Sequence, residues 1–389
     1  MTKNYHRKPR VLLLLNIAPT YRKAILTRLD NSEKVDFFFA ASDEDMQISK
    51  LMDLTLLSGF KGYLRPKFSG TKLIWQKGWF KLLFGKYDAF VLTANGGIRS
   101  NWLLTILARI MGKKVFLWGH GLYGNESRLE KCKLLTYMNL ASGMLLYGNY
   151  GKRQLLKTGY RESKIGVVYN SLNLHQQLLY RDRTENSLFI RNYFGSDAPV
   201  VVFLGRLTPQ KRLDMLLEAL GVLAAQNIEC NAIIVGTGPL EEKLKMRAKE
   251  IGVEDNVWFY GECFDESMIA TLFKNATITV SPGNVGLTAM HSLSYGVPVI
   301  THNYFCKQMP EFEAIKAGYS GDFFKFGDSI SLADTIHKWL DIMGDSERRK
   351  QISINCKGMI DNKYNPEFSA NKIETFLLDN LVHNLRNNK

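Results

Sequence analysis

The chain has 389 residues, of which 46% are apolar, so it is long enough for two domains with separate hydrophobic cores. No apolar stretch approaches the roughly 18 residues of a membrane-spanning helix, and no signal peptide is recognisable, so we expect a cytoplasmic protein. Residues 1–170 hold 28 Lys and Arg against 11 Asp and Glu, whereas the remainder holds 23 against 26. The basic half predicts an anionic partner, with a surface that only aids solubility as the alternative.

Short apolar runs alternate with helix-length segments through the first half. Strands are predicted at Val11–Asn16, Val35–Ala40, Ala89–Thr93, Lys114–Trp118, Gly143–Tyr147 and Gly166–Tyr169. Helices are predicted at Tyr21–Leu29, Asn101–Met111 and Arg128–Leu140. Apolar strands joined by helical crossovers indicate a parallel sheet that is covered on both faces.

A basic and aromatic segment lies between the second and third of these strands. Its cations are Lys61, Arg65, Lys67, Lys72, Lys77, Lys81 and Lys86. Its aromatic residues are Phe60, Tyr63, Phe68, Trp75, Trp79, Phe80 and Phe84. A helix over residues 72–84 would place Trp75 and Trp79 on one side, which favours a peripheral contact with an anionic membrane surface. A helix whose apolar side packs on the core is the alternative.

The alternation restarts after a polar segment at residues 180–192. Strands are predicted at Val200–Leu204, Asn231–Val235, Val257–Tyr260, Ile278–Val280 and Val297–Thr301. Helices are predicted at Leu213–Leu223, Leu240–Ile251, Asp265–Lys274 and Leu287–Tyr295. We therefore predict an α/β protein with two Rossmann-like, doubly wound domains that face a central cleft. The expected parts are an N-terminal domain (1–180), a linker (181–198), a C-terminal domain (199–365) and a helix (366–389) that packs back toward the N-terminal domain.

The first strand of the second half is followed by an unusual basic turn. No GxGxxG follows the first strand and no GxxxxGK[ST] occurs, which disfavours dinucleotide oxidoreductases and P-loop enzymes. Instead, Gly205 permits a tight turn, and Arg206 and Lys211 leave the end of the strand. A guanidinium fork and an ammonium point charge are suited to clamping a diphosphate. A solvated basic turn is the alternative.

Three more loops of the second half carry glycines at strand ends. Gly236 and Gly238 precede a helix, and Tyr260 and Gly261 follow the next strand, where the ring can line a flat pocket for a base. Residues 281–300, SPGNVGLTAMHSLSYGVPVI, predict a loop, a helix and a strand. The first amides of that helix, from Leu287 to Ala289, are expected to face an anion.

In this order and spacing, the motifs resemble family-4 retaining glycosyltransferases of the GT-B fold. The likeness covers residues 200–330 well and the first half more loosely. It implies transfer of a hexose-type sugar from a UDP- or GDP-sugar to a hydroxyl, with retention and without a cofactor. No D-x-D motif stands at the end of a predicted strand, so we expect a metal-independent enzyme in which Arg206 and Lys211 replace the metal. Arg206 and Lys211 are the implied catalytic cations. The implied donor-binding residues are Gly205, Gly236, Gly238, Tyr260, Gly261, Asn284, Val285, Gly286, Leu287, Thr288 and His291.

This chain departs from the family at two positions. The family usually carries two glutamates separated by seven residues. Alignment on residues 296–300 puts Gly283 at the first, which normally contacts the donor sugar, and His291 at the second, which normally contacts the ribose. His291 can bond a ribose hydroxyl as a neutral imidazole, and Asn284 can replace a sugar contact.

The resemblance also implies roles for residues at the ends of strands in the first half. His120, in LWGHG, matches a histidine that faces the donor sugar and the acceptor, so we expect a catalytic role; a histidine that caps a strand is the alternative. The loop after the first strand resembles the family's loop near the acceptor and the diphosphate. The expected acceptor-side residues are Ala18, Pro19, Tyr21, Arg22 and Asn95.

The sequence thus predicts a glycosyltransferase of surface polysaccharide assembly, whose acceptor is a saccharide or a lipid-linked saccharide. Two alternatives remain: a nucleotide-sugar 2-epimerase on the same fold, and a catalytically degenerate nucleotide-sugar-binding protein. No nucleic-acid-binding module is recognisable, so nucleic acid is not an expected partner. The five cysteines lack CxxC spacing, and no metal site is expected.

Overall fold

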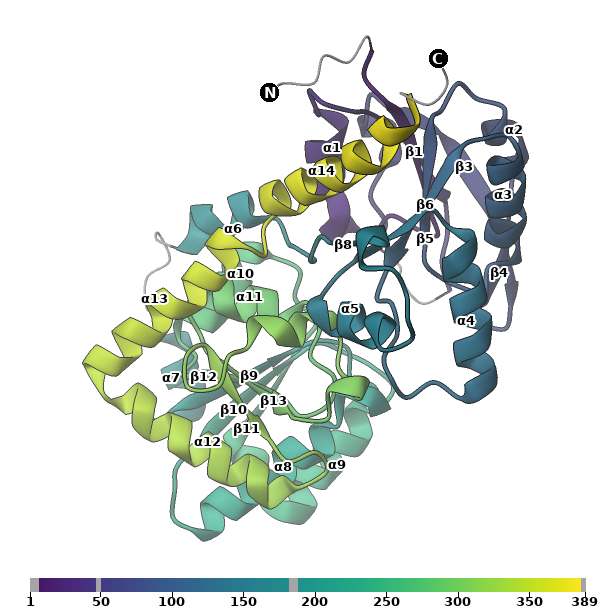
Figure 1. The fold of residues 1–389 in the computed structure, drawn as a ribbon. Helices are drawn as coiled ribbons and strands as arrows, with labels where there is room; N and C mark the ends of the chain where they lie inside the picture. The colour runs from purple at the N-terminus through teal and green to yellow at the C-terminus, as the bar shows by residue number, and fades with distance from the viewer. Residues whose placement is uncertain (1–6, 47–49, 182–187, 386–389) are drawn as a thin grey trace. The chain divides into compact units, whose positions relative to one another are not determined.

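The computed structural model describes residues 7–46, 50–181 and 188–385. Its contacts divide the chain into two compact units (Figure 1). The N-terminal unit comprises Met1–Asn173 and Pro366–Lys389, and the C-terminal unit comprises Leu174–Asn365. Part of the linker expected at 181–198, residues 182–187, lies outside the described residues, and the functional domain limits stay predictions.

The N-terminal unit is built on an eight-stranded sheet of order β4-β3-β2-β1-β5-β6-β7-β8. Its strands are β1 (Arg10–Leu15), β2 (Asp36–Ser42), β3 (Phe60–Ser69), β4 (Lys72–Lys77), β5 (Ala89–Thr93), β6 (Lys114–Gly119), β7 (Gly143–Leu146) and β8 (Ile165–Val167). Its helices are α1 (Lys23–Asp30), α2 (Trp79–Leu83), α3 (Arg99–Ile110), α4 (Arg128–Leu140), α5 (Asn149–Leu156) and α14 (Pro366–Leu385). All pairs are parallel except β3 with β4, which confirms the predicted covered parallel sheet.

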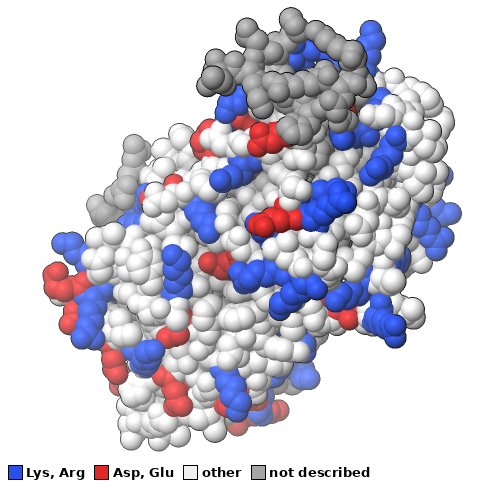
Figure 2. Space-filling view, viewed as in Figure 1, with Lys and Arg blue, Asp and Glu red and all other residues white. Residues whose placement is uncertain are grey.

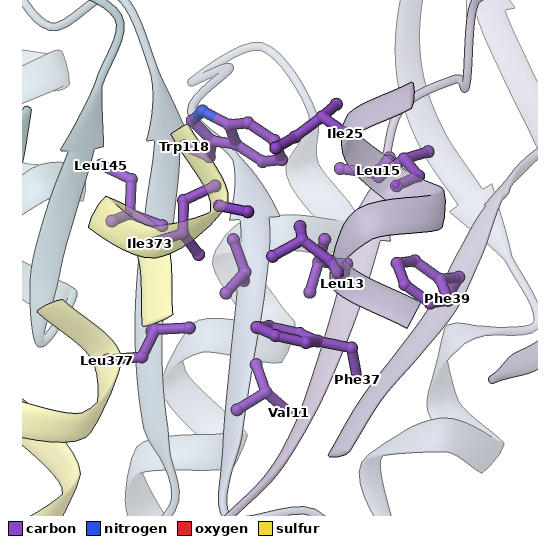
Figure 3. Packing of buried hydrophobic residues seen from close by; sticks show 14 of the residues in the cluster. Val11, Leu13, Leu15, Ile25, Phe37, Phe39, Trp118, Leu145, Ile373 and Leu377 are labelled. Atoms are coloured by element: carbon purple, nitrogen blue, oxygen red, sulfur yellow. The ribbon is translucent and has the colours of Figure 1, made fainter. Parts of the chain in front are cut away.

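Both faces of this sheet are buried, as alternate residues of β1 show. Val11, Leu13 and Leu15 pack on one side with the C-terminal helix residues Ile373 and Leu377 (Figure 3). Leu12 and Leu14 belong to the cluster on the opposite side, which α3 and α4 help to cover. A strand that is buried on both faces must be apolar throughout, which is why its sequence shows no alternation of apolar and polar residues.

The segment predicted as one helix over residues 72–84 is divided into a strand and a short helix, so that prediction is wrong. Residues 72–77 form β4, which pairs antiparallel with β3, and only Trp79–Leu83 is helical. Gln76 explains the difference, because its buried amide donates to Leu15 O (2.9 Å) and Ser42 Oγ (2.9 Å). Gln76 therefore ties the hairpin to the ends of β1 and β2, a tertiary contact that helical periodicity does not reveal.

A buried carboxylate fixes α14 on the N-terminal unit. Arg28 of α1 binds Glu374 (3.0 Å), whose side chain is 1% exposed, and also binds the exposed Glu367 (2.5 Å). Lys34 reaches the second oxygen of Glu374 at 3.4 Å. The ring of Phe376 lies on the same helix over Gly166 of β8, where an added Cβ would come within 2.7 Å of it.

Replacing Arg28 with alanine should lower the free energy of unfolding of this unit by about 3 kcal/mol, because it leaves a buried carboxylate under-compensated. Glu367→Gln, at the exposed end of the same network, should cost less than about 1 kcal/mol. Urea unfolding followed by circular dichroism measures both. Equal losses in the two variants would show that the burial of Glu374 is not what matters.

The C-terminal unit has a six-stranded, fully parallel sheet of order β11-β10-β9-β12-β13-β14. Its strands are β9 (Val200–Leu204), β10 (Asn231–Val235), β11 (Val257–Gly261), β12 (Ile278–Ser281), β13 (Val299–His302) and β14 (Gly321–Phe324). Its helices are α6 (Leu174–Arg181), α7 (Phe189–Phe194), α8 (Leu213–Ala225), α9 (Glu241–Ile251), α10 (Glu266–Lys274), α11 (Thr288–Ser294), α12 (Ser329–Gly344) and α13 (Ser346–Asn362). The strand order reverses between β9 and β12, and ligands of doubly wound sheets bind outside the carboxyl ends of strands at such a point.

Candidate functional site

The loops after β9 and β12 meet at this switch point and are bonded backbone to backbone. Gly283 N–H donates to Lys211 O (2.9 Å), and Asn284 N–H donates to Gln210 O (3.2 Å). A Cβ on Gly283 would lie 1.9 Å from Gln210 O. The glycine at the position of the first family glutamate is therefore required by packing, and no side chain fits there without moving the loop.

The ammonium group of Lys211 is fixed in the same place, on a side chain that is half-buried. Its Nζ donates to Asn284 O at 2.7 Å. Burial lowers its pKa to about 8, although the negative charge of Glu311 opposes the shift. Arg206, at the start of the same loop, is exposed. The loop thus holds one restrained cation and one surface cation at the end of β9, an arrangement that suits an anionic ligand.

Binding of a diphosphate at this loop should weaken as the pH rises through about 8. Lys211 is charged below its pKa and neutral above it, so the attraction is present at low pH and is lost on the alkaline side. Titration calorimetry with UDP and GDP between pH 6.5 and 9.5, a range of about 1.5 pH units on either side of that pKa, measures the dependence. Lys211→Arg should remove the alkaline loss because a guanidinium stays charged. An unchanged alkaline loss in that variant would assign it to another group.

The predicted glycines of the neighbouring loops lie against backbone. Gly236 has φ 133°, and a Cβ there would lie 2.0 Å from Gly205 O. A Cβ on Gly238 would lie 2.5 Å from Leu207 O. Gly236 N–H donates to Gly261 O at 2.7 Å, so the loops after β9, β10 and β11 are stacked directly on each other. At Gly236 and Gly238, contact between loops is a sufficient reason for glycine, and their contact with a donor stays a prediction.

Several groups of the loop before α11 already have protein partners. Val285 N–H donates to Gln308 Oε1 (2.8 Å), and the Thr288 hydroxyl donates to Leu204 O (2.5 Å). Ala289 N–H donates to Gly286 O, so the expectation that this amide is free for an anion is wrong. These bonds fix the start of α11 against β9. Gly286 and Leu287 lie half-buried at its first turn, and their donor contacts stay predictions.

His291 lies one turn further along α11 within a polar network. Its Nδ1 is 3.5 Å from Glu266 Oε1, on the first residue of α10, and 3.4 Å from Gln177 Nε2 of α6. The Tyr295 hydroxyl donates to the same Glu266 oxygen at 2.6 Å. Sequence reasoning found His291 but missed its neighbours. Glu266 and Gln177 come from other helices, so only the packing brings them to His291, whereas Tyr295 lies four residues on at the end of α11, where helical spacing would place it.

Tyr260 lies at the end of β11, as predicted. Its ring is half-buried and packs 5.2 Å from the ring of Trp258. That contact restrains the ring at the carboxyl edge of the sheet, and its use by a base stays a prediction.

In the N-terminal unit, the structure brings His120 and Arg22 together around Tyr147. Arg22 donates to the Tyr147 hydroxyl and lies 4.9 Å over the ring of Trp118. The His120 ring lies 5.1 Å from that of Tyr147. Burial and then the charge of Arg22 lower the pKa of His120 to about 4, so the imidazole is neutral at pH 7. Its buried Nδ1 has no hydrogen-bond partner among the described residues.

The other predicted acceptor-side residues occupy the switch point of this sheet, between β1 and β5. Ala18 O accepts from Met52 N–H (2.7 Å), and Pro19 is buried beside it. Tyr21 is half-buried one residue before Arg22. Asn95 is exposed after β5, and its side chain accepts from Gly97 N–H (2.9 Å), so it shapes its own turn. No described contact joins Asn95 to His120 or Arg22.

A solvent-open cavity of 560 Å³ lies beside β2 and the β3–β4 hairpin. Its acidic residues concern the prediction that no metal is bound. It is lined by Asp43, Glu44, Arg65, Pro66, Lys67 and Lys77. Because β2 runs to Ser42, Asp43 and Asp45 form a D-x-D pattern directly after it, and the expectation that no such motif stands at a strand end is wrong. Within the described residues, no three His, Cys, Asp or Glu side chains are grouped to hold a metal ion. Metal dependence stays a prediction.

The two doubly wound sheets define the class of fold, and solved structures agree with it. The Anabaena protein HepE in complex with UDP superposes with a TM-score of 0.70 at 17% identity, over 95% of this chain and 100% of that one. A glycosyltransferase from Rickettsia africae superposes with a TM-score of 0.72 at 16% identity, over 97% and 99%. The fold is the two-domain, Rossmann-like GT-B fold, as predicted.

The match to a family model lies in the C-terminal unit. Residues 186–359 match the family model described as "Glycosyl transferases group 1". The chain is similar to the GDP-mannose-dependent alpha-(1-6)-phosphatidylinositol dimannoside mannosyltransferase of Mycobacterium tuberculosis, with 28% identity over 115 residues. The aligned part covers 28% of this chain and 29% of that protein. It is 25% identical over 221 residues to the lipopolysaccharide 1,6-galactosyltransferase of Salmonella typhimurium, over 55% of each. The predicted family resemblance is confirmed.

Proposed function

We propose that this protein is a glycosyltransferase that moves a hexose-type sugar from a UDP- or GDP-sugar to a hydroxyl of a saccharide or lipid-linked saccharide, with retention, in surface polysaccharide assembly. The observation that carries the proposal is the restrained ammonium of Lys211 at the switch point of the β9–β14 sheet. A fixed cation there stabilises the charge that grows on a departing nucleoside diphosphate. The relative named for GDP-mannose and the neighbour that holds UDP support this choice of donors.

His120 and Arg22 complete the proposed chemistry on the N-terminal unit. A neutral imidazole with an unpartnered nitrogen can hold a sugar hydroxyl without carrying charge. Arg22 lies over the ring of Trp118 and is hydrogen-bonded to Tyr147. Its guanidinium can donate hydrogen bonds to the sugar acceptor or to the diphosphate.

A thermal-shift screen tests the donor proposal. UDP, GDP and their sugars should raise the melting temperature, because a ligand that binds only the native state stabilises it by mass action. One nucleotide should act at lower concentration than the other, which identifies the base. No shift with any of them would contradict the proposal.

We also propose that the basic N-terminal unit acts at an anionic membrane surface, but not through the tryptophans predicted for it. Trp79 is 4% exposed in the core and Trp75 packs against the same cluster, so that part of the prediction is wrong. The exposed apolar residues nearby are Phe80 and Phe84 at α2 and Leu103, Ile106, Ile110 and Met111 at α3. Figure 2 shows mostly basic charge over α2–α4 on the right of the view. No helix in the described residues is long and apolar enough to cross a membrane.

Replacing Phe84 (61% exposed) and Ile110 (76% exposed) with serine together should weaken binding to anionic vesicles about tenfold, because apolar burial at the interface is lost. Sedimentation with phosphatidylglycerol vesicles measures the binding, which should also fall as salt screens the charge attraction. Met246→Ser, which removes an exposed apolar residue of α9 in the other unit, is the matched control. Equal binding by all three proteins would refute this surface.

A further inference from the structure

The network around His291 contains a carboxylate that the proposed donor chemistry has not yet used. Glu266 comes from the first turn of α10, where Asp265 caps the helix by accepting from Ser267 N–H (2.8 Å). The cap fixes the start of α10, and α6 packs against both α10 and α11. Glu266 is therefore held by secondary structure on the histidine side of α11, and its side chain is 13% exposed.

Three donors converge on the Glu266 carboxylate. They are the Tyr295 hydroxyl at 2.6 Å, His291 Nδ1 at 3.5 Å and the amide of Gln177. Burial raises the pKa of Glu266, but the hydrogen bond and charge of His291 and the bonds from Tyr295 and Gln177 outweigh it, so the pKa lies below its usual value. The carboxylate is ionised at neutral pH, and an ionised carboxylate can only accept hydrogen bonds.

The geometry assigns a tautomer to His291. Glu266 Oε1 (3.5 Å) and the amide nitrogen of Gln177 (3.4 Å) both lie beside Nδ1. Because the Gln177 amide also donates to Glu266, the carboxylate is the acceptor that both donors share, and we assign the proton of the neutral ring to Nδ1. Nε2 then has the free lone pair. A ring fixed by a carboxylate behind it is also oriented, as in histidine ligands whose second nitrogen is held by a carboxylate.

We propose that Glu266 is a positioning residue that holds His291 with Nδ1 protonated, so that Nε2 accepts a hydrogen bond from a ribose hydroxyl of the nucleoside diphosphate. This inference rests on the proposed donor site. It makes the Glu266–His291 pair a specificity determinant for ribonucleotides over deoxyribonucleotides. A carboxylate from α10, acting through a histidine, thus supplies the hydrogen-bond acceptor that a glutamate on α11 would offer directly.

The test compares the affinity of the full chain for UDP and GDP with that for their 2′-deoxy and 3′-deoxy forms. Wild type should bind the ribonucleotide about tenfold more tightly than one of its deoxy forms, equal to about 1.4 kcal/mol. His291→Ala and the isosteric Glu266→Gln should both reduce this preference to about threefold or less, since the acceptor is lost or no longer fixed. Tyr295→Phe, which removes one anchor of Glu266, should have an intermediate effect. Glu254→Gln, an exposed residue of the same unit, should keep the full preference.

Nitrogen NMR of the imidazole rings gives a readout that a purely structural role would not change. The neutral His291 ring should give the signal of a ring protonated at Nδ1, and Glu266→Gln should move it toward the other tautomer. An unchanged preference in Glu266→Gln, an Nε2-protonated ring in wild type, or no preference in wild type would overturn the inference while nucleotide binding, and so the proposed function, stands. No binding of either nucleotide would refute both.

Discussion

Lys211→Ala should lower kcat/KM for sugar transfer by about ten- to a thousand-fold, or about 1.4–4 kcal/mol of transition-state stabilisation. Lys211 is half-buried and restrained by Asn284 O, so its charge is held in place and needs little reorganisation. Arg206→Ala should fall within the same range but nearer its lower end, because Arg206 is exposed and solvent weakens its charge.

Initial rates at several donor concentrations separate these effects. The loss should appear in kcat as well as in KM, because the charge on the leaving diphosphate grows in the transition state. Lys243→Ala, which removes an exposed cation of α9, is the matched control and should leave both constants unchanged. Near-normal turnover in the Lys211 and Arg206 variants would contradict the proposal that these two residues bind the diphosphate.

His120→Ala should reduce kcat about a hundred-fold while the affinity for free nucleoside diphosphate changes less than about threefold. The reason is that the unpartnered nitrogen of His120 is proposed to hold a sugar hydroxyl, which free UDP or GDP lacks. His120→Gln, which keeps a hydrogen-bonding group of similar reach, should recover part of the rate.

The pH dependence adds a second criterion for His120. With a pKa of about 4, the ring gains no proton between pH 7 and 5.5, so activity should not fall there through this residue. Weak nucleotide binding combined with normal turnover in His120→Ala would show that the histidine serves the nucleotide instead. Normal nucleotide affinity together with normal turnover in His120→Ala would show that His120 only caps the end of a strand.

The parallel sheets and the position of the sites were predictable, because their signals are local. β1, β5 and β9 are apolar runs that end in glycine, polar or basic turns, and each contributes to a switch point. The order of the motifs along residues 200–330 then indicated a family resemblance, and residues 186–359 match the model of glycosyl transferases group 1.

The β3–β4 hairpin and the Glu266 network could not be predicted in this way. Trp75 and Trp79 have helical spacing, but hydrogen bonds of Gln76 to the ends of two other strands decide the strand. Glu266 lies on a different helix from His291, and no spacing rule relates their positions. In both cases the deciding interaction is a tertiary contact of a polar side chain.

Product analysis by NMR shows whether the protein transfers a sugar. The protein is mixed with UDP-glucose, UDP-galactose or GDP-mannose and with lipid-linked saccharide acceptors. We expect one donor to be consumed only when acceptor is present, yielding free nucleoside diphosphate and a glycosylated acceptor with the donor's anomeric configuration, and we expect Lys211→Ala to slow this reaction. A C2-epimerised nucleotide sugar without transfer, or binding of the donors with no turnover by the wild-type protein, would contradict the proposed function.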